Sequence, residues 1–305
     1  MKLIKPSYEI WDQEIGLEGI YKQIEKAARV CYASKPKAKE LVENISSKDF
    51  VDKLIKLGHT SMLEHATVYL STEFGFGNAE VLRGNTLKNK YEKNPYSKSI
   101  FYGTKMYVTT NLRTLIENDW LKDLQYLCEP TKYHKKRITV YFNAISLGIT
   151  REFLRHRVFS FAQQSTRYCN YSKTNKFGEH LQFVKPYWCD ALLGDYIENN
   201  GLITNCFEGT EFQDMSNTTM YLISSLIIAE DAYKSLLSEK CSPQQAREVL
   251  PLALNAPLVM TGFVEDWKHF FNLRCSFKAV TGKPHPDASV LADPLYEEFK
   301  KMKLI

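Results

Sequence analysis

The side chains best suited to catalysis or ligand binding lie in one short stretch, Arg155–Tyr168. This stretch holds three arginines, a histidine, two glutamines, three serine or threonine hydroxyls and a tyrosine, interleaved with apolar residues. Guanidinium groups suit the planar, bidentate binding of phosphates and carbonyls, and hydroxyl and amide groups suit sugars and base edges. The stretch therefore predicts a nucleotide site, with a solvated basic face near a helix end as the alternative.

Two arginines further along the chain are candidates for the same site, Arg247 and Arg274. Arg247 follows a strong helix start at Ser242–Gln245 and precedes an apolar run, so it needs an anionic or carbonyl partner. For any one arginine, a salt bridge to a nearby glutamate is an equal alternative. The chain has neither a GxGxxG nor a GxxxxGK[ST] pattern, so a nucleotide site must be built from side chains.

Nucleophilic catalysis has little support in the sequence. Cys31 fits a small core residue better than a reactive thiol. Ser165 has His156 nearby in sequence but no evident third group to orient that histidine, so a hydrolytic triad is not expected.

Bulk composition predicts a globular protein of one or two domains in a reducing compartment. The 305 residues carry a net charge of +5, which fits a small anionic ligand at least as well as nucleic acid. Seven scattered cysteines without a CxxC pair argue against a disulfide framework and a structural zinc site. A zinc site at His59, Glu64 and His65 lacks the HExxH spacing. With no signal-peptide pattern and no membrane-length apolar run, we expect a cytoplasmic protein.

Hydrophobic spacing predicts several amphipathic helices and two clear strands. The helices are expected at 17–31, 47–57, 218–238, 263–274 and 287–304, and the strands at 66–74 and 137–146. A further helix should carry Arg151 and end within the Arg155–Tyr168 stretch, which then continues as a loop. Ser61 and Glu64 have capping-box spacing, which predicts a short helical turn. Residues 75–133 resemble an insertion with helices at 79–91 and 109–126, a lid or an oligomer contact, and residues 170–217 should form loops and short elements.

The Arg155–Tyr168 stretch resembles the signature of flavin-dependent thymidylate synthases. The matching pattern is Arg155-His156-Arg157, seven residues, then Ser165, followed by Thr166-Arg167-Tyr168. Four other blocks resemble that family in the same order: Ala27–Cys31, Gly58–His65, Ala246–Leu252 and Phe271–Arg274. Five ordered blocks at both ends of the chain make the resemblance specific.

The resemblance implies one α/β (α+β) domain over residues 1–305, with a central, mostly antiparallel sheet flanked by long helices and a family-atypical insertion at 75–133. It implies a homotetramer with active sites between subunits, in the cytoplasm, or the host cytoplasm for a virally encoded chain. The implied reaction methylates dUMP reductively to dTMP, with FAD as cofactor and with methylenetetrahydrofolate and NADPH as co-substrates. Neither a metal nor a nucleic acid nor a membrane is implied.

The resemblance also assigns roles to individual residues. Arg274 stands where the family has the arginine that stabilises the anionic uracil ring, and Ser165 is a substrate-binding hydroxyl rather than a nucleophile; these two are the catalytic candidates. The candidates for dUMP binding are Glu152, Arg155, Gln163, Gln164, Ser165, Thr166, Arg167, Arg247 and Arg274. The candidates for FAD binding are His59, Ser61, Arg155, His156, Arg157, Gln163, Phe263, Glu265 and His269.

Three departures from the family pattern affect these expectations. Glu152 stands where glutamine is common, so its carboxylate must be turned away, paired, or bonded to a sugar hydroxyl. Phe263–Glu265 replaces an Asn-Ala-Arg-like segment, and His269 replaces an asparagine. These departures motivate one alternative, an inactive or regulatory nucleotide-binding homologue. A second alternative is a module that binds single-stranded nucleic acid through arginines and aromatic rings such as Tyr168.

Overall fold

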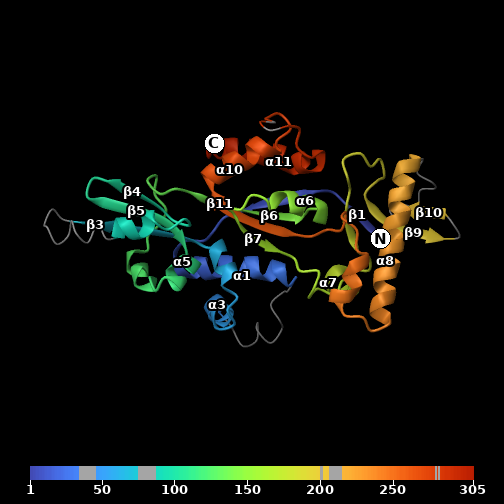
Figure 1. Ribbon diagram of the computed structural model, residues 1–305, viewed down its shortest axis with the longest axis horizontal. Coiled ribbons are helices and arrows are strands. Elements are labelled where there is room, and N and C mark those ends of the chain that lie inside the picture. Colours follow the sequence, from blue (N-terminus) through green and yellow to red (C-terminus); the bar gives the residue numbers. More distant parts are fainter. Residues whose placement is uncertain (34–45, 75–86, 200–201, 206–214, 279, 281) are drawn as a thin grey trace.

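A four-stranded antiparallel sheet forms the centre of the molecule (Figure 1). The computed structural model describes residues 1–33, 46–74, 87–199, 202–205, 215–278, 280 and 282–305. The strand order is β2-β6-β11-β7. Every residue of β11 is buried, because the sheet is covered on both faces. The strands are β2 (Ser7–Trp11), β6 (Arg137–Ala144), β11 (Leu258–Phe263) and β7 (Ser160–Gln163).

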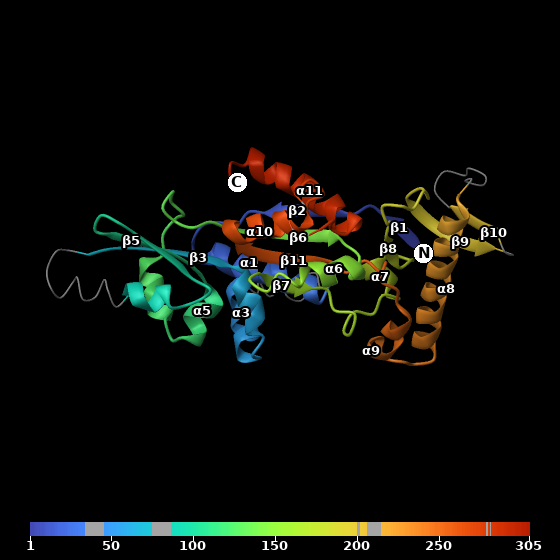
Figure 2. The same ribbon diagram turned by 45° about the horizontal axis from the view of Figure 1, so that its top comes forward.

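Helices cover the two faces of this sheet, as Figures 1 and 2 show from two directions. On one face lies α1 (Gly16–Cys31), whose Ala27 packs against Val259 and Ala162 of the strands. On the other face, apolar residues of β6 and β11 pack with those of α6, α10 and α11 into the main core. These helices are α6 (Leu147–Phe153), α10 (Val264–Arg274) and α11 (Pro286–Lys301).

A second core joins α1 and α3 (Ser47–Lys56) to a smaller sheet, which lies at one end of the molecule (left in Figure 1). This sheet is antiparallel, in the order β3-β5-β4. The elements here, besides the two helices, are the 3₁₀ helix η1 (Thr60–His65), β3 (Thr67–Glu73), β4 (Lys98–Tyr102), β5 (Lys105–Asn111), α5 (Leu112–Glu117) and the 3₁₀ helix η2 (Leu121–Tyr126).

At the other end, a long helix packs on a second four-stranded sheet, of order β10-β9-β1-β8. The capping box between Ser242 and Gln245 forms as the sequence predicts, with Pro243 in the first helical turn. The elements here are β1 (Lys2–Ile4), α7 (Thr174–Phe177), β8 (Gln182–Val184), β9 (Gly194–Asn199), β10 (Leu202–Asn205), α8 (Asn217–Ser238), α9 (Pro243–Ala246) and the 3₁₀ helix η3 (Arg247–Val249). No helix among the described residues has the length and apolar character needed to cross a membrane.

The structure confirms the mixed α and β class, the antiparallel central sheet and most of the expected helices and strands. Within the 75–133 segment the prediction of a helix from 109 was wrong, because residues 109–111 end β5 and the helix begins only at Leu112. The hairpin of β4 and β5 was not predicted, and part of the helix expected at 79–91 lies outside the described residues.

Of two further local predictions, one was wrong and one was right only in part. Residues 160–163 form the edge strand β7 rather than a loop, because they pair with β11 from Leu258 to Thr261. The short helical turn predicted at Ser61 and Glu64 is confirmed as η1, but its capping box does not form, since η1 starts after His59 without a side-chain cap and the Glu64 carboxylate binds Arg113 instead.

Gly262 in β11 leaves room for the ring of Phe159, a residue of the signature stretch. A methyl group at position 262 would lie 2.5 Å from two carbons of that ring, closer than van der Waals contact allows. We expect Gly262→Ala to destabilise the protein by about 1–3 kcal/mol, because the core must shift. Urea unfolding measures the difference, and Gly148→Ala, whose new methyl would lie 3.5 Å from Leu252, is the control with little change. Equal effects of the two substitutions would contradict the prediction.

Candidate functional site

Arg274, the last residue of α10, is held by three hydrogen bonds to α6 and the signature. Its Nη1 donates to the Glu152 carboxylate at 2.9 Å and its Nη2 to the Glu152 carbonyl at 2.6 Å. Its Nε donates to Nε2 of His156 at 3.0 Å. The side chain is 11% exposed, so the guanidinium is fixed in orientation but still reaches the surface.

Glu152 stands where the family commonly has glutamine. Its carboxylate is paired with arginines, which is one of the three arrangements expected from the sequence. Its carboxylate accepts from Arg274 and lies 3.4 Å from Nη1 of Arg155. The Arg155 side chain is 71% exposed and therefore free to contact a ligand as well. The acid thus orients Arg274 from α6.

His156 is buried and is held in its neutral form. Burial, together with Arg274 and His269, lowers the pKa of His156 from its ordinary 6.5 to about 4. The rings of His156 and His269 lie 6.0 Å apart, and His269 is exposed. A neutral imidazole can accept the Arg274 hydrogen bond, whereas an imidazolium could not.

This burial predicts a loss of stability in acid. Between pH 6.5 and 4 the unfolded chain binds a proton at His156 that the folded chain does not, so stability falls as the pH is lowered. We expect His156 to contribute about 2 kcal/mol to the loss between pH 7 and pH 5. Urea unfolding at both pH values should show a smaller loss for His156→Gln. Some loss should remain, because burial also lowers the pKa of His65, to about 3. The same loss in both proteins would contradict the assignment.

The second half of the signature forms a turn that packs against α9 and η3. The hydroxyl oxygen of Ser165 accepts from the backbone N–H groups of Arg167 and Tyr168 at 3.2 and 3.3 Å. The Thr166 hydroxyl accepts from Nη1 of Arg247 at 3.5 Å, and Arg167 Nε donates to the Gln244 side chain at 2.6 Å. Within the described part of the chain, no imidazole or carboxylate hydrogen-bonds the Ser165 hydroxyl. The turn thus presents two arginines beside a serine hydroxyl that no general base contacts.

Gln163 and Gln164 point to opposite faces of the sheet, because side chains alternate along a strand. Gln163 donates to the Thr150 hydroxyl of α6 at 3.1 Å, on the face that carries Arg274. Gln164 donates to the Tyr171 hydroxyl at 3.1 Å and borders a cavity on the α1 face.

Each face has a cavity beside its share of the candidate residues. Arg155 and Glu152 border one of about 600 Å³, and Gln164 borders one of about 610 Å³, within the usual range for ligand pockets. No hydrogen bond or ion pair between described residues joins the Arg274 group to the Ser165–Arg167 turn. Within the described residues, the two halves of the candidate site are therefore not linked by a direct polar contact.

His59 belongs to a row of aromatic rings beside the Ser165 turn. Its Nδ1 lies 3.2 Å from the Tyr32 hydroxyl, with the two rings stacked at 6.5 Å, and the Tyr168 ring lies 6.2 Å from that of Tyr32. Sequence reasoning missed Tyr32, although it directly follows the family block that ends at Cys31. Ser61 is exposed nearby in η1.

The remaining flavin candidates are spread over other parts of the protein. Phe263 is buried at the end of β11, near Arg137 and Lys98. Glu265 pairs with Lys135 at 2.9 Å. Arg157 is exposed in the turn between α6 and β7. Among the described residues, neither Phe263 nor Glu265 forms a side-chain hydrogen bond or ion pair with another candidate residue.

The side chains of the considered zinc site have different partners. The Glu64 carboxylate binds Arg113, and His65 Nδ1 lies 2.9 Å from the Thr261 hydroxyl. His59 contacts Tyr32. Within the described ranges, no cluster of three or more potential metal ligands forms.

Comparisons with known proteins identify one family of similar proteins. Residues 17–77 and 134–302 match the family profile described as "Thymidylate synthase complementing protein" (Thy1). The chain is similar to a flavin-dependent thymidylate synthase of Corynebacterium diphtheriae, with 25% identity over 58% of this chain and 65% of that protein. It is similar to one of Geobacter sulfurreducens, with 24% identity over 83% of this chain and 68% of that protein.

The match to the corynebacterial relative spans just under two thirds of its length. Among solved structures, a UMP/dUMP methylase, PolB, from Streptomyces cacaoi aligns over 99% of this chain and 92% of its own, with 16% identity and a TM-score of 0.41.

Proposed function

The chain belongs to the thymidylate synthase complementing protein family, and we propose that it is a flavin-dependent thymidylate synthase. It would convert dUMP to dTMP with methylenetetrahydrofolate as the carbon donor and NADPH as the reductant. The observation that carries this proposal is the oriented Arg274, which is bound to His156 of the signature and to the neighbouring Glu152. A fixed, partly exposed guanidinium suits the activation of a uracil ring, because it can stabilise the negative charge that develops on the ring.

Arg274 supplies electrostatic stabilisation in this proposal. When the uracil ring is attacked or deprotonated, negative charge develops on its carbonyl oxygens, and a fixed cation stabilises that charge without reorganisation. Glu152 and His156 are positioning residues, because they hold the guanidinium through three hydrogen bonds. Since His156 is neutral, it adds no positive charge that would push Arg274 away.

Arg167 and Arg247 are the proposed partners of the dUMP phosphate. Arg247 is 40% exposed, and its charge is balanced only loosely by the adjacent Glu248 at 3.6 Å. Arg167 is exposed and is oriented by Gln244. Guanidinium groups bind phosphate oxygens in a bidentate manner. The Ser165 oxygen accepts hydrogen bonds from two backbone N–H groups, so its O–H can donate a hydrogen bond to the substrate.

The residues also suit a flavin nucleotide. The rings of His59, Tyr32 and Tyr168 offer aromatic surface to a planar ring system, and the exposed Arg155 and Arg157 offer cations for a diphosphate. A bound FAD would supply hydride-transfer chemistry, while the protein orients the reactants. Phe263 and Glu265 are not needed for this arrangement.

The protein needs no nucleophile of its own for this reaction. Cys31 lies next to the Ser165 turn, since its carbonyl accepts from the Ser165 N–H at 2.9 Å. Burial raises the pKa of Cys31 to about 11, and burial also raises the pKa of Cys169. Both thiols are therefore protonated near neutral pH and poor nucleophiles.

We also propose that the active site is completed between copies of the chain, as in a homotetramer. The support for this is that Gln163 contacts α6 on the Arg274 face, whereas Gln164, next to the Ser165–Arg167 turn, borders the cavity on the α1 face. A second copy can supply the missing half, since symmetric assemblies repeat such complementary surfaces.

The test uses purified full-length protein and its absorption spectrum. The protein should be yellow or take up added FAD, NADPH should bleach the flavin, and dUMP should perturb its spectrum. Tritium should be released from dUMP labelled at C5 when methylenetetrahydrofolate and NADPH are present. A protein that takes up no FAD would contradict the proposal, and so would a flavin protein without tritium release. The latter outcome would instead support a nucleotide-binding homologue without activity.

A further inference from the structure

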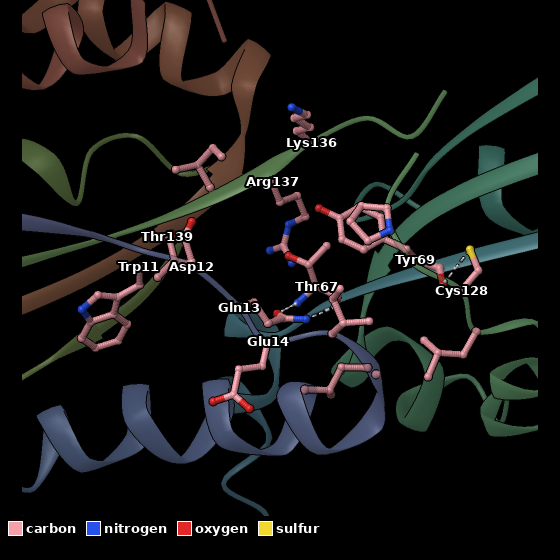
Figure 3. A pocket seen from close by; sticks show the side chains of 16 residues that line it. Trp11, Asp12, Gln13, Glu14, Thr67, Tyr69, Cys128, Lys136, Arg137 and Thr139 are labelled. Carbon is pink, nitrogen blue, oxygen red and sulfur yellow. Dashed lines mark hydrogen bonds between the residues drawn. The ribbon is translucent and has the colours of Figure 1, made fainter. Parts of the chain in front are cut away.

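A cavity of about 210 Å³ lies between α1, β3 and the start of β6 (Figure 3). None of its 16 lining residues is a candidate for binding dUMP or FAD. Three of them belong to the 75–133 segment, which the family profile does not match beyond residue 77. These three are Leu127, Cys128 and Pro130. The described end of the inserted segment therefore closes a pocket onto the central sheet.

Arg137, the first residue of β6, lines this cavity and is 9% exposed. Figure 3 shows its guanidinium beside Thr139 and Thr67. Its Nη2 donates to the Glu64 carbonyl at 3.0 Å. Its Nη1 is buried and has no hydrogen-bond partner among the described residues. Burial lowers the pKa of Arg137 to about 10, and the side chain therefore keeps its positive charge at neutral pH.

The nearby carboxylates do not compensate this charge by direct contact. The Glu64 carboxylate is bound by Arg113, and that of Asp266 accepts from the backbone N–H of Phe263 at 3.1 Å. No described residue forms an ion pair with Arg137 within 4.0 Å. A buried guanidinium with an unused donor is costly unless an anionic or carbonyl group completes it.

We propose that this cavity binds a small organic anion, with its carboxylate or phosphate head on Arg137. A planar guanidinium matches the geometry of an oxyanion, and the enclosed Nη1 would meet it after a small shift of the Arg137 side chain. Neither the proposed reaction nor its cofactor is needed for this binding. The inserted segment, for which the sequence suggested only a lid or an oligomer contact, thereby acquires a binding role.

The walls of the cavity determine the polarity and size of the part of the ligand beyond its anionic head. Ile20, Leu127 and the Tyr69 ring provide apolar surface. At roughly 10–15 Å³ per water-sized probe, the cavity of about 210 Å³ has room for about 14–21 such probes, so it is larger than a bare ion needs and admits a small organic body. The wall is also pre-formed, because the Gln13 side-chain amide both donates to and accepts from the Thr67 backbone at 2.7 Å.

The rim is mixed in charge, with the exposed Asp12 and Glu14 opposite Lys136. Glu14 is paired with Lys22 at 2.7 Å. Arg137 is therefore the cation that is set in the depth of the pocket, which favours a ligand with one anionic head.

The experiment titrates full-length protein with benzoate, inorganic phosphate and neutral benzamide while thermal unfolding is followed. We expect a saturable rise in Tm with benzoate, phosphate or both, which identifies the preferred head group, and none with benzamide. Arg137→Gln should weaken the affinity by about tenfold or more, because a charge-assisted hydrogen bond is lost. Lys136→Gln, which removes the same charge at the rim, is the matched control and should change the affinity little.

A second measurement on the unaltered chain covers the case in which Arg137→Gln does not fold. Cys128 lines the cavity and is only partly buried, so bound benzoate or phosphate should slow its alkylation by iodoacetamide. Alkylation of Cys241, which is also partly buried but lies outside the cavity, should not change. The proposal is overturned if neither anion gives a saturable Tm shift or protection, or if benzamide acts as strongly as benzoate.

Discussion

Replacing Arg274 with alanine is expected to lower kcat for tritium release from dUMP by about a hundredfold to a thousandfold. This is the usual effect of removing one fixed group that stabilises developing negative charge. Arg274 is mostly buried, and its three hydrogen bonds fix its direction before substrate binds. The measurement is the rate of tritium release at saturating dUMP.

Two control variants separate this effect from simple loss of structure. Arg113, like Arg274, forms ion pairs with glutamate, here Glu64 and Glu117, but it lies in the inserted segment. Arg113→Ala is therefore the first control. It should leave kcat close to that of the unaltered protein. Arg274→Lys keeps the positive charge but not the planar donors, so it should recover only part of the rate. Full activity of Arg274→Ala in a folded, flavin-bound protein would rule out its proposed role.

Mixing two inactive variants is expected to restore activity. Arg274→Ala removes the group on one face of β7, and Arg247→Ala removes the group at the Ser165–Arg167 turn. If each active site takes these residues from different copies, random reassembly at equal amounts leaves about a quarter of the sites with both arginines. The recovered activity should therefore approach about a quarter of that of the unaltered protein.

The assay requires subunits that exchange, for example after mild denaturation and refolding of the mixed variants. The double variant Arg247→Ala with Arg274→Ala, refolded with the unaltered protein, is the matched control. Each variant refolded alone should stay inactive. A mixture that also stays inactive, although it refolds and binds flavin, would mean that both arginines serve a site within one copy.

The part of the site that follows from local sequence was predictable. Ser242 with Pro243 and Gln245 forms its capping box from neighbours alone, and this places Arg247 directly after the short helix. Long amphipathic helices such as Asn217–Ser238 follow from apolar spacing. These features depend on residues a few positions apart, which a sequence displays directly.

Long-range pairing could not be predicted in this way. Residues 160–163 became a strand only because β11, about a hundred residues later, offers its edge. Residues 109–111 joined a strand because β3 and β4 pair with β5 on its two sides. The Arg274 bond to His156 spans 118 positions, so sequence could assign both residues to a site only by resemblance, without their contact.

The bond between Arg274 and His156 has a spectroscopic consequence. Because Nε2 of the neutral ring accepts from the arginine, the single imidazole proton must sit on Nδ1. The tautomer of His156 is thus imposed by Arg274. In Arg274→Ala that constraint is lost, and nitrogen NMR of the imidazole can follow the change in tautomer without any turnover.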